Sequence, residues 1–158
     1  MRYLPILFAI LLAACSSSPK SEGASGSSAA DAGAAKAYLD KAAAEQGAIR
    51  TPSGLVYREL QAGTGAYPGA SDVVKVHYRG TLINGTEFDS SYARNEPATF
   101  PLNRVIPCWT EGLQRMKVGG KSRLVCPAAI AYGDQGSPPV IPGGATLVFE
   151  VELLGIGG

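Results

Sequence analysis

Short stretches in which every second residue is large and apolar run through the C-terminal two-thirds of this chain. In residues 73–79 and 147–153, the side chains between the apolar ones are mostly charged or polar. A period of two is typical of a strand that buries one face. Apolar runs predict further strands at residues 55–60, 86–89, 100–102 and 122–126. Gly80 is expected to end the 73–79 strand, and Asn84-Gly85 to form a tight hairpin after it.

One segment between these strands has helical spacing. Trp109, Gly112, Leu113 and Met116 follow the i, i+3, i+4, i+7 pattern of one helix face, and the glycines at 119–120 are expected to end the helix. The pattern therefore predicts an α+β domain over residues 51–158. In it, a strongly curved antiparallel sheet of about five strands wraps one short α-helix.

The N-terminus has the pattern of a targeting signal. Arg2 is followed by an apolar run over residues 4–14, which ends in small residues directly before Cys15. The run is shorter than the about 20 residues that a membrane-spanning helix needs. Residues 1–15 thus resemble a bacterial lipoprotein signal peptide, whose cleavage exposes a cysteine for acylation. The alternative is an ordinary secretory signal followed by a chance cysteine.

Acylation has consequences for location. Several acyl chains on Cys15 would anchor the protein stably to a bilayer. Ser16 resembles the pattern for sorting to the outer membrane. The expected location is the bacterial envelope, at the outer membrane, facing the periplasm or the cell surface. Residues 16–50 are expected to form a flexible Ser/Gly/Ala tether. Within it, residues 34–46 predict a short helix, which packs on the domain, serves as a weak partner helix or is a solvated spacer.

Charge and cysteine content narrow the functional classes. The net charge is +1 and no basic run occurs, which argues against a nucleic-acid-binding protein. His77 is the only histidine, so no His-rich metal site is expected. With Cys15 acylated, Cys108 and Cys126 remain as a pair in an oxidising compartment, and no C-x-x-C redox motif is present. We predict a buried disulfide between them. The alternative is two separate buried thiols.

Aromatic side chains are the main candidates for a binding site. Those of the predicted domain include Tyr78, Phe88, Phe100, Trp109, Tyr132 and Phe149, and Asp89 directly follows Phe88. Such a set suits an apolar pocket with one or two polar groups, which binds a peptide side chain better than it performs proton transfer or nucleophilic attack. The alternative for each ring is plain core packing, because inward positions of a strand usually belong to the core.

Five short motifs give a more specific indication. They are Val76-His77-Tyr78-Arg79-Gly80, Phe88-Asp89-Ser90-Ser91, Val105-Ile106-Pro107-Cys108-Trp109, Ala131-Tyr132-Gly133 and Ala145-Thr146-Leu147-Val148-Phe149. In this order they resemble the signatures of FKBP-type peptidyl-prolyl cis-trans isomerases, over residues 53–154. The chain is most similar to the bacterial envelope branch that includes the macrophage infectivity potentiator lipoproteins.

The resemblance implies an enzyme that accelerates rotation about X-Pro bonds and needs no metal or other cofactor. The implied catalytic residues are Asp89, Tyr132 and Phe88. The implied substrate-binding residues are Tyr78, Phe88, Asp89, Val105, Ile106, Trp109, Tyr132, Val140, Ile141 and Phe149. Trp109 would form the floor of the pocket, the Tyr132 hydroxyl and the Ile106 N–H would bond substrate carbonyls, and Asp89 would place a carboxylate beside the reacting amide.

The resemblance also implies partners. These are proline-containing polypeptides and macrolide inhibitors such as rapamycin, besides the membrane that the lipid anchor reaches. The branch often has a long dimerisation helix, of which only the 34–46 segment is recognisable, so a monomer is favoured. Ala98, Ile130 and Ser137 depart from the family at the pocket rim and bear on substrate preference. The alternative function is a polypeptide-binding chaperone that uses the same pocket with little turnover.

Overall fold

The computed structural model describes residues 29–157. Its helices and strands are α1 (Ala29–Ala43), β1 (Ala48–Arg50), β2 (Val56–Gln61), β3 (Val73–Leu82), β4 (Glu87–Ser90), β5 (Ala98–Pro101), η1 (Leu102–Arg104), α2 (Pro107–Leu113), β6 (Lys121–Cys126), η2 (Ala128–Ile130) and β7 (Leu147–Ile156), where η marks a 3-10 turn. The predicted signal peptide and Cys15 lie outside the described residues. No helix in the described part is long and apolar enough to cross a membrane.

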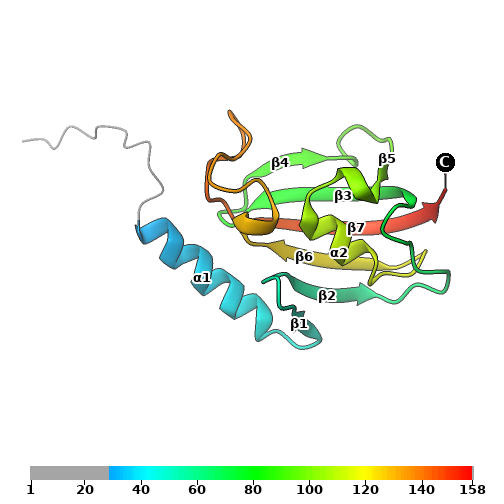
Figure 1. Ribbon diagram of the computed structural model, residues 1–158, viewed down its shortest axis with the longest axis horizontal. Coiled ribbons are helices and arrows are strands. Elements are labelled where there is room, and N and C mark those ends of the chain that lie inside the picture. The colour runs from blue at the N-terminus through cyan, green and yellow to red at the C-terminus, as the bar shows by residue number, and fades with distance from the viewer. Residues whose placement is uncertain (1–28, 158) are drawn as a thin grey trace, which may run out of the picture.

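The seven strands form one antiparallel sheet in the order β1-β2-β6-β7-β3-β4 (Figure 1). β5 also pairs with β3, so that β4 and β5 take opposite ends of one edge of this long strand. The predicted α+β class is confirmed, whereas about five strands was too low a number. β1 was missed because its three residues are all at least partly exposed, and only pairing with β2 holds it in place.

The packed part of the chain begins before Thr51, where the sequence pattern placed the start of the domain. α1 covers one face of the sheet through Leu39 and Ala42. The two side chains pack against a row of valines that crosses β2, β6 and β7, namely Val56, Val125 and Val148. Of the three interpretations of the short helix, the structure therefore agrees with the one in which it packs on the domain.

The main core lies on the opposite face of the sheet. There the neighbouring row across the same strands, Tyr57, Leu124 and Phe149, belongs to a large buried cluster. This cluster also includes Trp109 and Leu113 of α2, which crosses the sheet (Figure 1). α2 has seven residues, which is too short to be stable alone. Its Trp109 and Leu113 are buried in this cluster, so tertiary packing rather than helix propensity fixes the helix.

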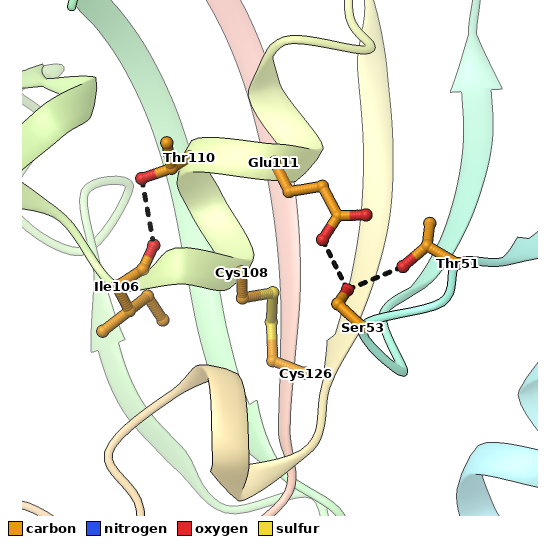
Figure 2. The surroundings of a disulfide bond; sticks show 7 residues. All are labelled: Thr51, Ser53, Ile106, Cys108, Thr110, Glu111 and Cys126. Carbon is orange, nitrogen blue, oxygen red and sulfur yellow. Dashed lines mark hydrogen bonds between the residues drawn. A yellow bond between two sulfur atoms is a disulfide. The ribbon is translucent and has the colours of Figure 1, made fainter. Parts of the chain in front are cut away.

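Two further links hold α2 in place (Figure 2). Cys108 in its first turn and Cys126 at the end of β6 are fully buried and form a disulfide bond, with Cα atoms 5.8 Å apart. The Ser53 hydroxyl donates a hydrogen bond to Glu111 at 2.5 Å and lies 2.8 Å from the Thr51 hydroxyl. The helix is thus tied both to β6 and to the loop before β2.

Gly80 does not end β3, contrary to the prediction. The strand continues to Leu82, and the hairpin at Asn84-Gly85 follows it. A Cβ atom at residue 80 would lie 2.6 Å from Cζ of Phe88 and 2.9 Å from Cε1 of Phe149. Glycine in a strand interior often marks such a close approach. Here it lets two aromatic rings pack directly against the backbone.

We predict that Gly80→Ala destabilises the protein by about 1–3 kcal/mol, the usual cost of overpacking, because the rings of Phe88 and Phe149 must move. Gly155→Ala is the matched control, since a Cβ there meets nothing within 4 Å. Urea unfolding measures both free energies. Equal stability of the two variants would show that the rings yield without cost.

Candidate functional site

A cleft of about 360 Å³ opens beside α2 on the main-core side of the sheet. Of the ten substrate-binding residues predicted from the sequence, eight line it. These are Tyr78, Phe88, Asp89, Val105, Ile106, Trp109, Tyr132 and Phe149. The cleft therefore gathers side chains from β3, β4, α2, β7 and the loops around them, although they lie far apart in the sequence.

The indole of Trp109 is the centre of the aromatic lining. Its ring is surrounded edge-to-face by Tyr78 at 5.1 Å, Phe149 at 5.3 Å and Phe100 at 5.5 Å between centroids. Phe88 continues the set, in edge contact with Phe149 at 5.5 Å. Edge-to-face pairs are the arrangement that aromatic quadrupoles favour, and they leave ring surfaces fixed in orientation. The cleft thus has rigid apolar walls.

One polar network lies on this wall. The Tyr78 hydroxyl donates to Oδ2 of Asp89 at 2.5 Å, and Arg94 donates to Oδ1 of the same carboxylate at 2.7 Å. A second nitrogen of Arg94 donates to the Tyr78 oxygen at 3.1 Å, and the guanidinium lies 5.8 Å from the Tyr78 ring centroid. Both oxygens of the carboxylate are therefore occupied.

The network sets the charge state of its members. Burial, the largest single influence, would raise the pKa of Asp89, but the hydrogen bonds from Tyr78 and Arg94 outweigh it and hold this pKa below its ordinary value. Burial, followed by the hydrogen bond to Asp89, raises the pKa of the Tyr78 phenol. At neutral pH the carboxyl is thus ionised and the phenol neutral.

Two further polar groups border the cleft without a partner in the described part of the chain. The Tyr132 side chain is 41% exposed, and its hydroxyl makes no hydrogen bond with any residue between 29 and 157. The Ile106 backbone N–H, directly before α2, likewise has no acceptor there. Both groups are free to bond a ligand.

Val140 and Ile141 are the two predicted residues that the cleft lining does not include. Ile141 is 4% exposed and belongs to the main core, where it also pairs with Ser137. Val140 is 53% exposed on the same loop. The alternating orientation of neighbouring residues sends one side chain inward and the other outward.

Three residues at the cleft were not among the implied catalytic or substrate-binding residues, although Phe100 was one of the six candidate aromatics. Phe100 and Arg104 line it, and Arg94 binds Asp89. Phe100 lies opposite Val74 in the β3–β5 pairing, so its inward orientation follows from strand register, which the short run did not reveal. Arg94 and Arg104 lie in a loop and a 3-10 turn, where no periodicity indicates direction.

A second cleft of about 240 Å³ lies on the opposite face, between α1 and the β3–β4 hairpin. It is more polar, but its arginines already have acidic partners. Arg123 contacts Glu45 at 3.5 Å, and Arg79 donates to Glu87 at 2.7 Å. The aromatic cleft is therefore the better candidate, because two groups at its border, the Tyr132 hydroxyl and the Ile106 N–H, have no partner in the described part of the chain.

The chemistry available at the aromatic cleft is limited. His77 contacts the Ser91 hydroxyl at 2.9 Å, but Ser91 is fully buried and bonded to the Tyr78 backbone, so it cannot act as a nucleophile on substrate. Within residues 29–157, no three His, Cys, Asp or Glu residues gather as metal ligands. What remains is an apolar hollow with free hydrogen-bonding groups and one ionised carboxylate, that of Asp89, which is paired with Arg94.

Comparison with known proteins gives a consistent picture. The family described as FKBP-type peptidyl-prolyl cis-trans isomerase matches residues 65–154. The chain is 56% identical over 119 residues to the isomerase FkpA of Aeromonas hydrophila, covering 75% of this chain and 44% of that protein. It is 46% identical over 121 residues to the isomerase Mip of Coxiella burnetii, covering 77% and 53%. It thus spans about half the length of these relatives.

Solved structures agree with this assignment. The crystal structure of FkpA from Escherichia coli matches with a TM-score of 0.79 and 50% identity, covering 82% of this chain and 60% of that one. A peptidyl-prolyl cis-trans isomerase from Pseudomonas syringae matches with a TM-score of 0.74 and 37% identity, covering 80% and 92%.

We predict that Arg94→Met raises the pKa of Asp89, because one of the two side-chain hydrogen bonds that lower it is lost together with the nearby positive charge. The control Arg79→Met breaks a comparable exposed ion pair with Glu87 and leaves the Asp89 pKa unchanged. A ¹³C NMR titration of the side-chain carboxyl measures both. The same pKa in the Arg94 and Arg79 variants would contradict the role given to Arg94.

The sign of the linked stability follows. A folded-state pKa below the unfolded value means that the Asp89 interactions stabilise the fold above the unfolded pKa of about 3.9 and lose this effect as pH falls through the folded value. The difference in unfolding free energy between wild type and Arg94→Met should therefore shrink below about pH 4. This difference should stay small throughout, since both side chains are about half exposed and solvent screens their interaction.

Proposed function

We propose that this chain, which belongs to the family of FKBP-type peptidyl-prolyl cis-trans isomerases, catalyses rotation about the peptide bond that precedes proline. The observation that carries the proposal is the rigid aromatic cleft around Trp109, with free hydrogen-bonding groups at its border. A pyrrolidine ring is an apolar object of a size that such a hollow accommodates, and its two neighbouring carbonyls are hydrogen-bond acceptors.

The physical task needs no proton transfer. Resonance puts a barrier of about 18–20 kcal/mol on rotation of a peptide bond. In the twisted transition state this resonance is lost, so the carbonyl is less polar than in the planar ground state. An apolar cleft therefore disfavours the planar form relative to the twisted one. Each 1.36 kcal/mol of this difference gives about a tenfold increase in rate.

We assign the following roles. Trp109 supports the proline ring, with Tyr78, Phe88 and Phe149 as walls and Val105 and Ile106 along one side. The Tyr132 hydroxyl and the Ile106 N–H donate to substrate carbonyls. Asp89 places its carboxylate beside the reacting amide, with Arg94 and Tyr78 as supports. Val140 and Ile141 belong to the loop beside the cleft, and Val140 is the one exposed enough to reach a bound chain.

We further propose that the protein works in the bacterial envelope. The apolar run before Cys15 supports lipid anchoring at the outer membrane, facing the periplasm or the cell surface. The segment that begins at Ser16 then connects the anchor to the domain, against which α1 and β1 pack ahead of residue 51. In this oxidising compartment the Cys108–Cys126 disulfide forms and holds α2 against β6. Its burial supports this, because both cysteines are 0% exposed.

The proposed partners are proline-containing polypeptides, and rapamycin-like macrolides as competitors for the same cleft. A monomer is the proposed state.

A chaperone that holds polypeptide in this cleft with little turnover is the second candidate, favoured by the same apolar lining and open mouth. The two functions differ in turnover. A protease-coupled isomerisation assay on a short X-Pro peptide, with and without rapamycin, separates them: a rate equal to the uncatalysed one supports the chaperone.

We predict that Tyr132→Phe lowers kcat/KM roughly two- to tenfold, the effect of losing one hydrogen bond of about 0.5–1.5 kcal/mol. The melting temperature should change by less than about 4 °C, because the hydroxyl bonds nothing within the described residues. Tyr92→Phe, which removes a similarly exposed hydroxyl outside the cleft, is the control and should keep full activity. Full activity of Tyr132→Phe would remove the hydroxyl from the mechanism.

We also predict that kcat/KM is independent of pH from about 6 to 8.5. The pKa of Asp89 is lowered from its ordinary value and that of Tyr78 is raised from its own, so neither group at the cleft titrates in this range. A protease-free NMR exchange assay checks this over the whole range. If kcat/KM of the wild type rose or fell with pH in this range, a titrating group and hence proton transfer would take part in the reaction.

A further inference from the structure

Arg104 is the one charged side chain of the cleft lining that the mechanism does not use. It is exposed, and it forms no ion pair or side-chain hydrogen bond with any residue in the described range 29–157. The other charge on the lining, Asp89, is already neutralised by Arg94. As far as residues 29–157 are concerned, the mouth of the cleft therefore carries one positive charge without an acidic partner.

The backbone that carries this charge is well fixed. Arg104 ends η1, whose first residue, Leu102, is fully buried. The Thr110 hydroxyl of α2 donates to the Leu102 carbonyl at 2.6 Å, and the Leu102 N–H donates to the Asp72 carbonyl at 2.9 Å. Arg104 also lies two residues before Ile106, whose N–H is free at the cleft. The backbone of Arg104 is thus fixed next to the proposed path of the substrate, and its guanidinium extends from there.

On the basis of the proposed isomerase function, we infer that Arg104 selects among substrates by charge. It favours proline-containing segments with an Asp or Glu close to the proline and disfavours those with Lys or Arg there. The contact is at the rim rather than at the rotating bond, so it binds the ground state and the transition state alike. Its effect then appears in KM and leaves kcat nearly unchanged.

The test uses the full-length protein and two sets of X-Pro peptides, one varied at the position before the X-Pro pair and one at the position after it. Each set holds three peptides that differ only in having Glu, Gln or Lys at the varied position. Protease-free NMR exchange gives kcat and KM, so peptide charge does not disturb a coupling enzyme. For wild type we expect kcat/KM to be about two- to fivefold higher for Glu than for Lys in at least one set, the range that exposed ion pairs give. This ratio should fall as salt is added.

Variants of Arg104 decide the cause. Arg104→Gln should bring the Glu-to-Lys ratio close to one, and Arg104→Glu should invert it. Lys75→Glu is the matched control, since it changes the net charge equally from an exposed position of β3 on the other face of the sheet, and it should keep the wild-type ratio. Because the Glu-to-Lys ratio of kcat/KM is taken within each variant, a loss of activity that is common to all peptides cancels.

The possible outcomes distinguish a failure of this inference from a failure of the proposed isomerase function. No acceleration of the Gln peptide by wild type would overturn the isomerase proposal itself. Acceleration with equal rates for Glu and Lys, or an Arg104→Glu variant that keeps the wild-type preference, would overturn the role of Arg104 alone. A ratio that Lys75→Glu inverts as well would mean that net charge, not Arg104, selects the substrate.

Discussion

The packing of one indole ring against three strands is the contact on which the cleft depends. Trp109 lies on a helix too short to be stable alone, and its ring meets Tyr78 of β3, Phe100 of β5 and Phe149 of β7 edge-on. These contacts fix the helix on the sheet and, at the same time, fix the three rings relative to one another. The same interactions thus stabilise the fold and shape the site, so changes in this cluster affect both.

The cleft is nevertheless a hollow and not a filled core, and two features border it. Gly80 allows Phe88 and Phe149 to lie directly against the backbone of β3. The Tyr78–Asp89–Arg94 network adds hydrogen-bonded polar groups to an otherwise aromatic wall. Trp109 also keeps a buried Nε1–H with no acceptor in the described residues, a cost of about 1–3 kcal/mol that the surrounding packing offsets.

Much of this arrangement follows from the sequence, although some features depend on tertiary contacts. Period-two alternation identified the long strands and the inward orientation of Tyr78 and Phe149, and the motifs identified the family. The sequence did not reveal the features that depend on which strands pair with one another. β1 has no buried side chain of its own, and Gly80 looked like a strand end because glycine is a common breaker, whereas rings from two other strands require it. Arg94 and Arg104 reach the cleft from irregular backbone, whose direction only tertiary structure sets.

The position of α1 has a consequence for how such a domain can be joined to other sequence. α1 packs on the valine row of Val56, Val125 and Val148, and the cleft opens on the reverse side of the sheet. The described part of the chain therefore begins on the face turned away from the cleft, and α1 adds contacts to the sheet without covering the aromatic lining.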